Sequence, residues 1–319
     1  MDPLAARATA AARMKAQGLS SPSGDGLAVV RRLVGLQAQD HWIAQYAVRT
    51  RARSGRLADV GIAWTMRGTL HLVAAEDLHW LVDLLGPRHA AGYAGRRARL
   101  GLTDALLRTG VRALVDRLPA TRDELLAVAA EVGVPAGQAR AHLLAYAGMT
   151  GELCQIDGEF RRIPAGRKVP DDLAGELGRR YLTGYGPASA EDFAAWSGLP
   201  LTVARKALPD QASTKDSAKD DASPVPGVKL LGHFDPYLLG YRDRTFALPA
   251  AYAGKVQRGG GFLQPVVLVD GMVAGTWTRT QGTGRRKGEM TVSVDAWADV
   301  PAAGLAAEVE DLNRDWWRS

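Results

Sequence analysis

The feature that most constrains the fold of this chain is a run of three predicted helices followed by a predicted β-hairpin. Thr121 and Glu124 form a capping-box pattern, which marks the start of the middle helix. An Asp157-Gly158 pair between two short strand-like runs is typical of a hairpin turn. Helices and a hairpin in this order predict a winged helix-turn-helix. The four elements are expected over 103–118, 121–133, 135–151 and 152–163.

Two other segments look like looser copies of this unit. Residues 171–208 predict three helices, with Ser189 capping the middle one and Gly198 ending it. No wing is visible after them, because 209–227 is polar and low in apolar residues, as flexible loops are. The N-terminal copy is expected to have helices over 4–17 and 25–36, a pair of strands within 62–73, and a helix over 74–85.

The last third of the chain has a different character. Residues 228–244, 261–280 and 289–297 are β-rich, with turns at Asp270-Gly271 and near 282–284. A closing helix is expected over 305–317. The predicted fold class is α+β, with tandem winged helix-turn-helix units and a small C-terminal β-barrel or sheet. The expected domains are 1–100, 101–170, 171–230 (a third unit interrupted by the 209–227 linker) and 231–319.

The composition indicates the cell compartment of the protein and excludes some kinds of metal and disulfide site. The single cysteine, Cys154, excludes a disulfide framework and a cysteine-rich metal site, and it fits a reducing cytosol. The N-terminus has no apolar stretch long enough for a secretory signal, and no stretch approaches the length of a membrane span. We therefore expect a cytoplasmic protein without membrane contact.

The charge indicates an anionic partner. The net charge is +6 and the sequence pI is about 9.5. Arginines dominate 88–122, and arginine is the side chain whose geometry best suits phosphate. A solvated surface in an arginine-rich proteome explains the same charge, so charge alone leaves nucleic-acid binding open.

Metal and nucleophile motifs are not found in the sequence. The six histidines are scattered without metal-ligand spacing, so we expect no metal and no cofactor. Gly259-Gly260-Gly261 lacks the flanking strand, helix and Lys-Ser/Thr of a phosphate loop, and we interpret it as a turn. Cys154 is interpreted as a packing residue.

Two glutamines are the most informative polar residues. Gln37 and Gln39 flank Ala38, and Leu36 and Trp42 lie close by in sequence. Paired glutamines usually occupy a solvated face. The apolar neighbours instead favour a partly buried turn, where each amide must find hydrogen-bond partners.

The stretch GLQAQD at 35–40 resembles the Gln-x-Gln motif of the AlkZ-like branch of the AlkZ/YcaQ winged-helix DNA glycosylases. This branch confers resistance to azinomycin-type alkylating antibiotics. Met66–His71 and Phe234–Arg244 also resemble signatures of this family, and their order and spacing fit. The resemblance covers nearly the whole chain.

The resemblance implies a C-shaped molecule around a channel for double-stranded DNA that contains alkylated purines. The repeat architecture fits a monomer, although the sequence leaves the oligomeric state open. It implies a monofunctional glycosylase without metal, cofactor or covalent lysine intermediate. Expected substrates are N7-alkylguanine, N3-alkyladenine and bulky antibiotic adducts, and interstrand crosslinks that the enzyme unhooks. The chain is short for the family, and the linker interrupts its third unit.

Residue roles are carried over only where the motif matches. Gln37 and Gln39 are the expected catalytic pair. Asp40, a rival base, and His71 and Asp235 are possible auxiliaries, although each of the last two is more often structural. Arg67 and Thr69 are expected to be structural or DNA-facing. A DNA-entering hairpin is placed at 278–289, with the candidate contacts Arg279, Arg285, Arg286 and Lys287.

Two non-enzymatic readings compete with the glycosylase. A winged-helix regulator explains the repeated units and arginine clusters, but not the glutamine pair. A scaffold that only shields damaged DNA is the third reading. The sequence also leaves open the native lesion and the choice between antibiotic self-resistance and general repair.

Overall fold

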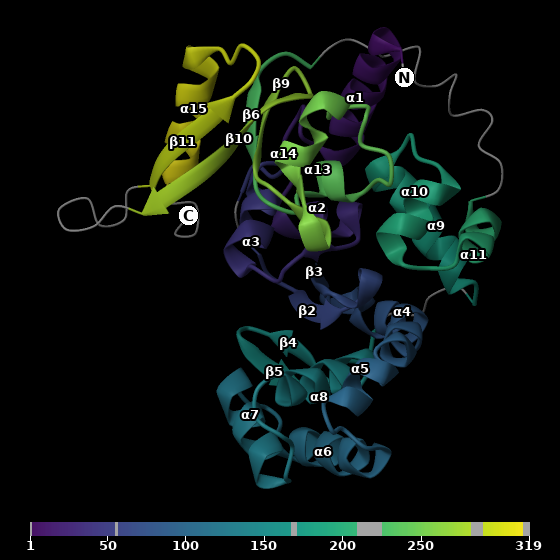
Figure 1. Cartoon of the computed structure of the whole chain (residues 1–319). Helices are drawn as coiled ribbons and strands as arrows, with labels where there is room; N and C mark the ends of the chain where they lie inside the picture. Colours follow the sequence, from purple (N-terminus) through teal and green to yellow (C-terminus); the bar gives the residue numbers. More distant parts are fainter. Residues whose placement is uncertain (1, 55–56, 167–170, 209–224, 282–289, 315–319) are drawn as a thin grey trace.

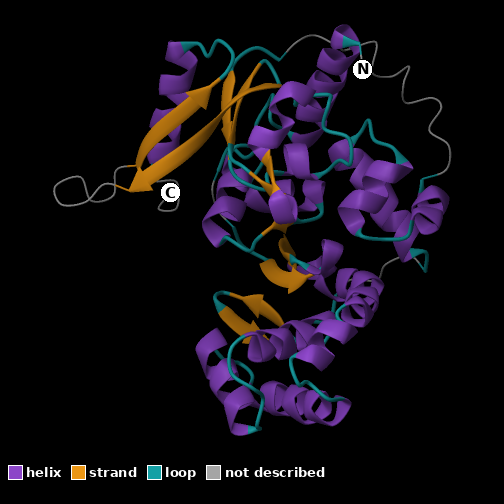
Figure 2. Cartoon of the chain, viewed as in Figure 1, coloured by secondary structure: helices purple, strands orange, loops and turns teal. Residues whose placement is uncertain are grey.

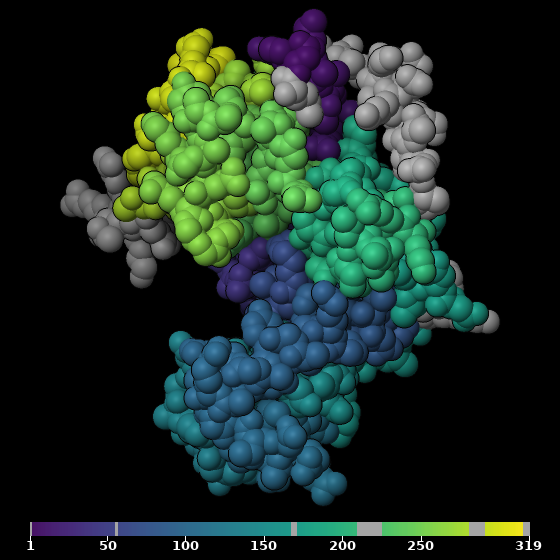
Figure 3. Space-filling view, turned by 45° about the vertical axis from the view of Figure 1, so that its right-hand side comes forward, coloured from purple at the N-terminus to yellow at the C-terminus, as the bar shows by residue number. Residues whose placement is uncertain are grey.

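The computed structural model describes residues 2–54, 57–166, 171–208, 225–281 and 290–314. It is an α+β molecule in which one lobe lies below the rest of the chain, and this lobe is built from the segment between α5 (Ala94–Arg99) and α8 (Gln138–Met149) (Figure 1). Figure 2 shows that helices dominate this lower lobe, whereas the longest strands lie in the upper lobe. In Figure 3 the surface is hollowed between the two lobes, and the indigo segment that contains α3 lies in this hollow.

The N-terminal segment begins with helices, continues through the strands β1 to β3 and ends in two further helices. Aspartates cap the first three helices: the side chains of Asp2, Asp25 and Asp40 each accept a backbone N–H of the following turn. The elements are α1 (Pro3–Gln17), α2 (Gly26–Leu33), β1 (Leu36–Gln37), α3 (His41–Arg49), β2 (Val60–Trp64), η1 (Met66–Gly68), β3 (Leu70–Ala74), η2 (Ala75–Asp77), α4 (Leu78–Gly92) and α5 (Ala94–Arg99).

The helix expected over 25–36 is shorter than predicted. It ends at Leu33, because Val34 adopts a left-handed backbone with φ 62° that no α-helix continues. The chain then enters β1. Gln37 therefore lies on a strand, and its neighbours alternate between two faces.

The expected run of three helices and a hairpin is confirmed. Thr121 and Glu124 form both hydrogen bonds of the capping box. Asp157 and Gly158 both have positive φ, as a two-residue hairpin turn requires. The elements are α6 (Asp104–Arg117), α7 (Arg122–Glu131), α8 (Gln138–Met149), β4 (Cys154–Ile156) and β5 (Glu159–Arg161).

One sheet joins this hairpin to the N-terminal strands. Its order is β1-β3-β2-β4-β5, and Ile62 of β2 pairs with Gln155 of β4. The sheet therefore contains strands from both of the first two expected domains, 1–100 and 101–170.

A third group of helices packs against the N-terminal segment. Ser189 and Asp192 form a second capping box, and Gly198 ends the helix in the left-handed conformation. At Gly184 an added Cβ would lie 2.2 Å from the Arg32 carbonyl oxygen, so only glycine permits this approach to α2. The helices are α9 (Leu173–Tyr185), α10 (Ala190–Ser197) and α11 (Leu201–Ala207). Most of the expected 209–227 linker lies outside the described residues.

The C-terminal region is an open sheet rather than a barrel. Within the described residues its four strands are antiparallel in the order β11-β10-β9-β6, and the edge strands do not pair with each other. The helix α15 instead contacts the two edge strands, β6 and β11. Leu312 of this helix is buried in an apolar cluster with residues of the sheet. The helix thus covers apolar side chains that a closed barrel would have enclosed. The strands are β6 (Val228–Leu231), β9 (Val266–Val269), β10 (Met272–Gln281) and β11 (Met290–Ala296).

The segment between β6 and β9 is less β-rich than expected. Asp235 caps a short helix with Pro236 at its first position, so the chain leaves the sheet after Leu231. The remaining elements are α13 (Pro236–Leu239), η3 (Ala250–Tyr252), α14 (Ala253–Val256), β7 (Gln257–Arg258), η4 (Gly259–Gly261), β8 (Phe262–Leu263) and α15 (Ala302–Asn313). Within the described part of the chain, no helix is both long and apolar enough to cross a membrane.

Candidate active site

The two glutamines share one side of a short extended segment. Gln37 pairs with His71 of β3, and the Ala38 N–H donates to the Leu70 carbonyl at 2.8 Å. Ala38 is fully buried, whereas Gln37 is 8% exposed and Gln39 is exposed. Because side chains alternate along an extended chain, Ala38 anchors the segment in the core and both amides face the opposite way. The Gln37 Nε2 donates to the Gln39 Oε1 at 2.6 Å.

Arg67 determines which way both amides face. Its Nη2 donates to the Gln37 Oε1 at 3.2 Å, and its Nη1 donates to the Trp196 carbonyl at 3.1 Å. A guanidinium only donates, so the Gln37 atom facing it must be the oxygen. The Gln37 NH₂ then faces Gln39 and requires an oxygen there. The exposed Gln39 keeps its own NH₂ and one lone pair of Oε1 for water or a ligand.

The backbone around Arg67 is shaped to bring this side chain to the glutamines. Arg67 has φ 54° in η1, between strands β2 and β3. Burial lowers the pKa of Arg67, yet a guanidinium remains charged. Among the described residues no carboxylate forms an ion pair with it. Arg67 is therefore a partly buried positive charge that no carboxylate of the described residues neutralises.

A basic pocket of about 700 Å³ adjoins the glutamine pair through Arg67. Arg88 and His89 also line it. Burial, and then the charges of Arg88 and Arg67, lower the pKa of His89 to about 4, so this ring is neutral at pH 7. The buried His89 Nε2 has no hydrogen-bond partner among the described residues. The pocket thus offers positive charge without any acidic lining residue.

His71 and Thr69 make contacts inside their own turn. The His71 Nδ1 lies 2.9 Å from the Thr69 carbonyl, so this nitrogen carries the proton of the neutral ring. Burial, more than the nearby Arg67, lowers the pKa of His71 to about 3. The Thr69 hydroxyl donates to the Met66 carbonyl.

The two candidate carboxylates have different surroundings. Asp40 caps α3 by accepting from Trp42 N at 3.0 Å and Ile43 N at 3.3 Å. Its other oxygen lies 3.7 Å from the His233 Nε2. Asp235 is buried and forms a two-pronged ion pair with Arg51, at 2.6 and 3.0 Å. Asp235 is therefore saturated by structural contacts, whereas Asp40 lies beside the glutamines.

One strand of the expected DNA-entering hairpin reaches the same site. The Arg279 guanidinium lies 3.4 Å from the centre of the Trp42 ring, on which it stacks. Burial lowers the pKa of Arg279, and Asp40 opposes this effect. Arg285, Arg286 and Lys287 lie outside the described residues.

The family model described as "DNA glycosylase AlkZ-like" matches residues 30–314, which include the glutamines, Arg67 and Arg279. The chain belongs to the AlkZ-like DNA glycosylase family. This membership confirms the resemblance drawn from the 35–40 stretch and identifies the chain as a DNA glycosylase. It thereby favours the enzyme over a regulator and over a shielding scaffold.

A curated sequence and a solved structure from Streptomyces sahachiroi are similar to this AlkZ-like glycosylase. The curated "Interstrand DNA cross-link repair glycosylase" is 28% identical, and the match covers 78% of this chain and 81% of that protein. The solved structure of the DNA glycosylase AlkZ has a TM-score of 0.76 and 24% identity, with 96% of each chain covered. The structural match shows a shared α+β fold.

The described residues of this AlkZ-like glycosylase offer no metal-ligand cluster and a single, buried thiol. Across the described ranges, no three His, Cys, Asp or Glu side chains gather where they could hold a metal ion. Burial raises the pKa of Cys154 to about 12, so its thiol is not ionised at neutral pH.

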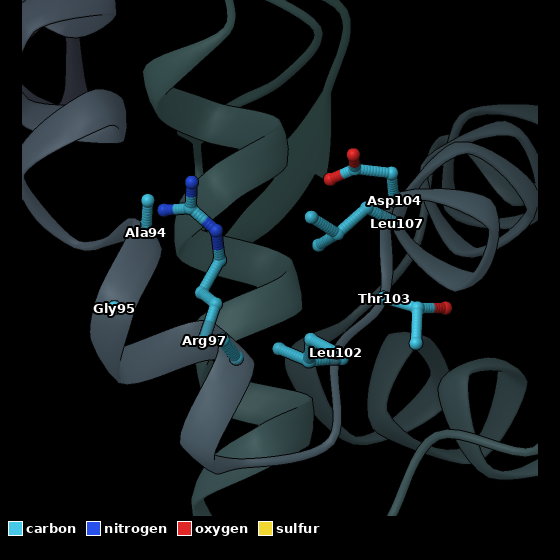
Figure 4. A pocket seen from close by; sticks show the side chains of 8 residues that line it. Ala94, Gly95, Arg97, Leu102, Thr103, Asp104 and Leu107 are labelled. Carbon is cyan, nitrogen blue, oxygen red and sulfur yellow. The ribbon is translucent and has the colours of Figure 1, made fainter.

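A second pocket, of about 480 Å³, lies between α5 and α6. Figure 4 shows Arg97 on one wall and Asp104 on the other, with Leu102 and Leu107 lining the space. Arg97 stacks on Tyr146, which indicates a packing role. No candidate catalytic residue lines this pocket.

Three residues near the glutamines were not among the sequence-based candidates. They are Trp42, His233 and Phe262, which the fold brings to the surroundings of Asp40 and Arg279. A weak signal existed for two of them: Trp42 follows the glutamine motif, and His233 precedes the Phe234–Arg244 signature. Nothing in the sequence singled out Phe262, because its place depends on contacts between distant segments.

Proposed function

We propose that this AlkZ-like glycosylase excises alkylated purines from duplex DNA, with Gln37 and Gln39 as its catalytic pair. The observation that carries the proposal is the hydrogen-bonded arrangement of Arg67, Gln37 and Gln39, which leaves the NH₂ and one Oε1 lone pair of Gln39 available at the surface. The substrates are N7-alkylguanine, N3-alkyladenine and bulky adducts. The printed name of the Streptomyces sahachiroi relative supports a further activity, the unhooking of interstrand crosslinks.

The chemistry requires alignment more than acid or base strength. Alkylation at guanine N7 or adenine N3 makes the base positively charged, and therefore a good leaving group. The bond from sugar C1′ to the base nitrogen breaks, and the base departs neutral with the bonding electrons. A water oxygen then bonds to C1′ and releases its proton to solvent. The free lone pair of Gln39 Oε1 orients this water, and the amides stabilise the charge that develops on the sugar.

The charge of the site requires an anion from the substrate. Arg67 would repel the positive sugar of the transition state if nothing neutralised it. A backbone phosphate in the pocket of Arg67 and Arg88 supplies that negative charge. DNA binding and catalysis are thus coupled at Arg67, which is both DNA-facing and in contact with Gln37.

The hollow between the lobes is the proposed path of the DNA. The hollow visible in Figure 3 supports a C-shaped molecule, in which the three-helix units act as winged helices along the duplex. The four units 1–100, 101–170, 171–230 and 231–319 surround this path. An open channel admits a bulky adduct that a tight flipping pocket would exclude. In this proposal the enzyme works as a monomer in the cytoplasm.

A single-turnover assay tests the proposal. A duplex with one N7-methylguanine is incubated with excess protein, and alkali then cleaves the abasic sites. Strand cleavage is expected with the wild-type chain and is expected to disappear with Gln37→Ala/Gln39→Ala. If both proteins bind the duplex and neither releases the base, the same assay on a crosslinked duplex decides: no unhooking there would refute the proposal.

A further inference from the structure

A small hairpin borders the candidate active site, and no step of the proposed chemistry uses it. Strands β7 and β8 pair with the register Gln257↔Leu263 and Arg258↔Phe262. Gly259, Gly260 and Gly261 form its tip, and an added Cβ at any of them would meet nothing within 4 Å. The tip is therefore bare backbone in open space, which permits close approach to another molecule.

The base of this hairpin is fixed to the fold. Leu263 is buried, the Gln264 N–H donates to the Val256 carbonyl, and the Arg244 Nη1 donates to the Gln257 Oε1 at 3.1 Å. The hairpin is thus a supported projection with an unoccupied tip.

Phe262 is exposed on this hairpin although it is large and apolar. Phe262 is 36% exposed, and Leu4 is the only other large apolar side chain that is exposed among the described residues. Its ring stacks on His233 with centroids 5.7 Å apart and meets Phe234 edge-on at 4.9 Å. These contacts fix the orientation of the Phe262 ring, while part of the ring stays open to solvent.

The aromatic cluster is continuous with the glutamine site. His233 lies 3.7 Å from Asp40, the residue that follows Gln39. Arg279, which stacks on Trp42, also interacts electrostatically with Asp40. Two stacked assemblies therefore lie beside Asp40, next to the glutamines.

Positive charge accompanies the exposed ring. Arg258 is directly opposite Phe262 in the hairpin, so both side chains leave the same face. Arg258 and Arg279 are exposed. An exposed ring beside arginines is the combination with which proteins hold an unpaired base and its phosphate.

We propose that the β7–β8 hairpin is a DNA-contacting element in which Phe262 stacks on an unpaired nucleobase beside the lesion and Arg258 contacts the adjacent phosphate. The inference rests on the proposed function, because it assumes that the lesion lies at Gln39. A protein partner would require a wider apolar surface than one ring. The glycine tip instead fits the narrow space next to a sugar–phosphate backbone.

Binding of the full chain to two fluorescent duplexes tests the inference. One duplex is intact, and the other carries a tetrahydrofuran abasic-site analogue, which leaves the opposite base unpaired. Phe262→Ala is expected to weaken binding to the second duplex by about 5- to 150-fold, the measured range for base–aromatic stacking. Binding to the intact duplex should change much less. Phe262→Trp should keep the affinity, and Phe262→Leu should lose most of it.

Leu4→Ala is the matched control, since Leu4 is the other exposed large apolar residue and lies on α1. It should bind both duplexes as the wild type does. Arg258→Gln should weaken binding to both duplexes and reduce the salt dependence by about one phosphate contact.

The inference is overturned if Phe262→Ala binds both duplexes like the wild type, or if Phe262→Leu retains the wild-type preference. Binding needs no excision. A wild-type chain that binds through Phe262 but excises nothing would therefore contradict the proposed function alone.

Discussion

At the residue scale, two consecutive hydrogen bonds connect a partly buried cation, Arg67, to the exposed amide of Gln39. Arg67 donates to Gln37, and Gln37 donates to Gln39. Each hydrogen bond removes one of the two ways in which an amide can be oriented, so Gln39 presents its free groups in one arrangement. The free-energy cost of orienting the Gln39 amide is therefore met in the folded protein, before the substrate binds.

Replacing Arg67 by methionine should therefore slow excision at saturating protein by about 10- to 150-fold, as expected for the loss of a hydrogen bond to a charged group. The rate constant of a single-turnover reaction, measured together with the duplex dissociation constant, separates slower chemistry from weaker binding. Arg88→Met is the matched control, because Arg88 lines the same pocket without contacting Gln37. It should weaken binding and leave the saturated rate unchanged. Equal saturated rates in Arg67→Met and the wild type would show that Arg67 does not position the glutamines.

His71 should make the stability of the protein depend on pH. Its pKa falls from 6.5 in the unfolded chain to about 3 in the fold, so between these values only the unfolded chain binds the proton. Above pH 6.5 the neutral His71 ring makes its full contribution to the free energy of unfolding. This contribution declines below that pH by at most about 1.4 kcal/mol per pH unit, until His71 is protonated in the fold as well. Urea unfolding of the wild type and His71→Asn at several pH values measures this slope, and equal slopes for both proteins would contradict the assignment.

At the element scale, local signals predicted the helices and turns well. The capping boxes at Thr121 and Ser189 and the Asp157-Gly158 turn depend on neighbouring residues only, so the sequence displays them. The end of α2 was missed, because a valine with positive φ is rare and nothing in the local sequence predicts one at Val34. For the C-terminal region the sequence predicted a barrel or a sheet, and the barrel was wrong. The closure of a sheet depends on pairing between distant strands, which no local pattern encodes.

The same distinction applies to the candidate site. The glutamine pair follows from a local motif, but the contact of Arg67 with Gln37 joins residues 30 positions apart. The contacts of Arg279 with Trp42 and of His233 with Asp40 join still more distant segments. The sequence thus identified the two amides, Arg67 and Arg279 as candidates, but it did not predict the contacts that Arg67 and Arg279 make around them.

The crossing of α4 and α8 gives a test at this scale. An added Cβ at Gly86 would lie 2.0 Å from the Met149 carbonyl oxygen, so Gly86→Ala must push the two helices apart. We expect a loss of about 1–3 kcal/mol in the free energy of unfolding, as for other overpacked cores. Gly92→Ala in the same helix is the control, since its Cβ would meet nothing within 4 Å. Denaturant unfolding should show it unchanged or more stable, and the close contact would be disproved if both variants unfolded alike.

At the scale of the whole molecule, one sheet and one charge pattern link the parts. The β1-β3-β2-β4-β5 sheet ties the lower lobe to the strand that carries Gln37. The excess of positive charge, +6 overall, is appropriate for a polyanionic partner. In the proposed function, the glutamine segment, the basic pocket and the β7–β8 hairpin act on the same stretch of DNA, which lies in the hollow between the lobes.

The central claim is that Gln37 and Gln39 act as one unit in hydrolysis. Single-turnover excision of N7-methylguanine by Gln37→Ala, Gln39→Ala and the double variant, with folding and duplex binding checked for each, tests it most directly. Either single variant should lose about a hundred- to ten-thousandfold in rate, and the double variant should lose little more, because residues that work as a unit are strongly non-additive. Independent losses that multiply in the double variant, or a single variant with the wild-type rate, would contradict the account.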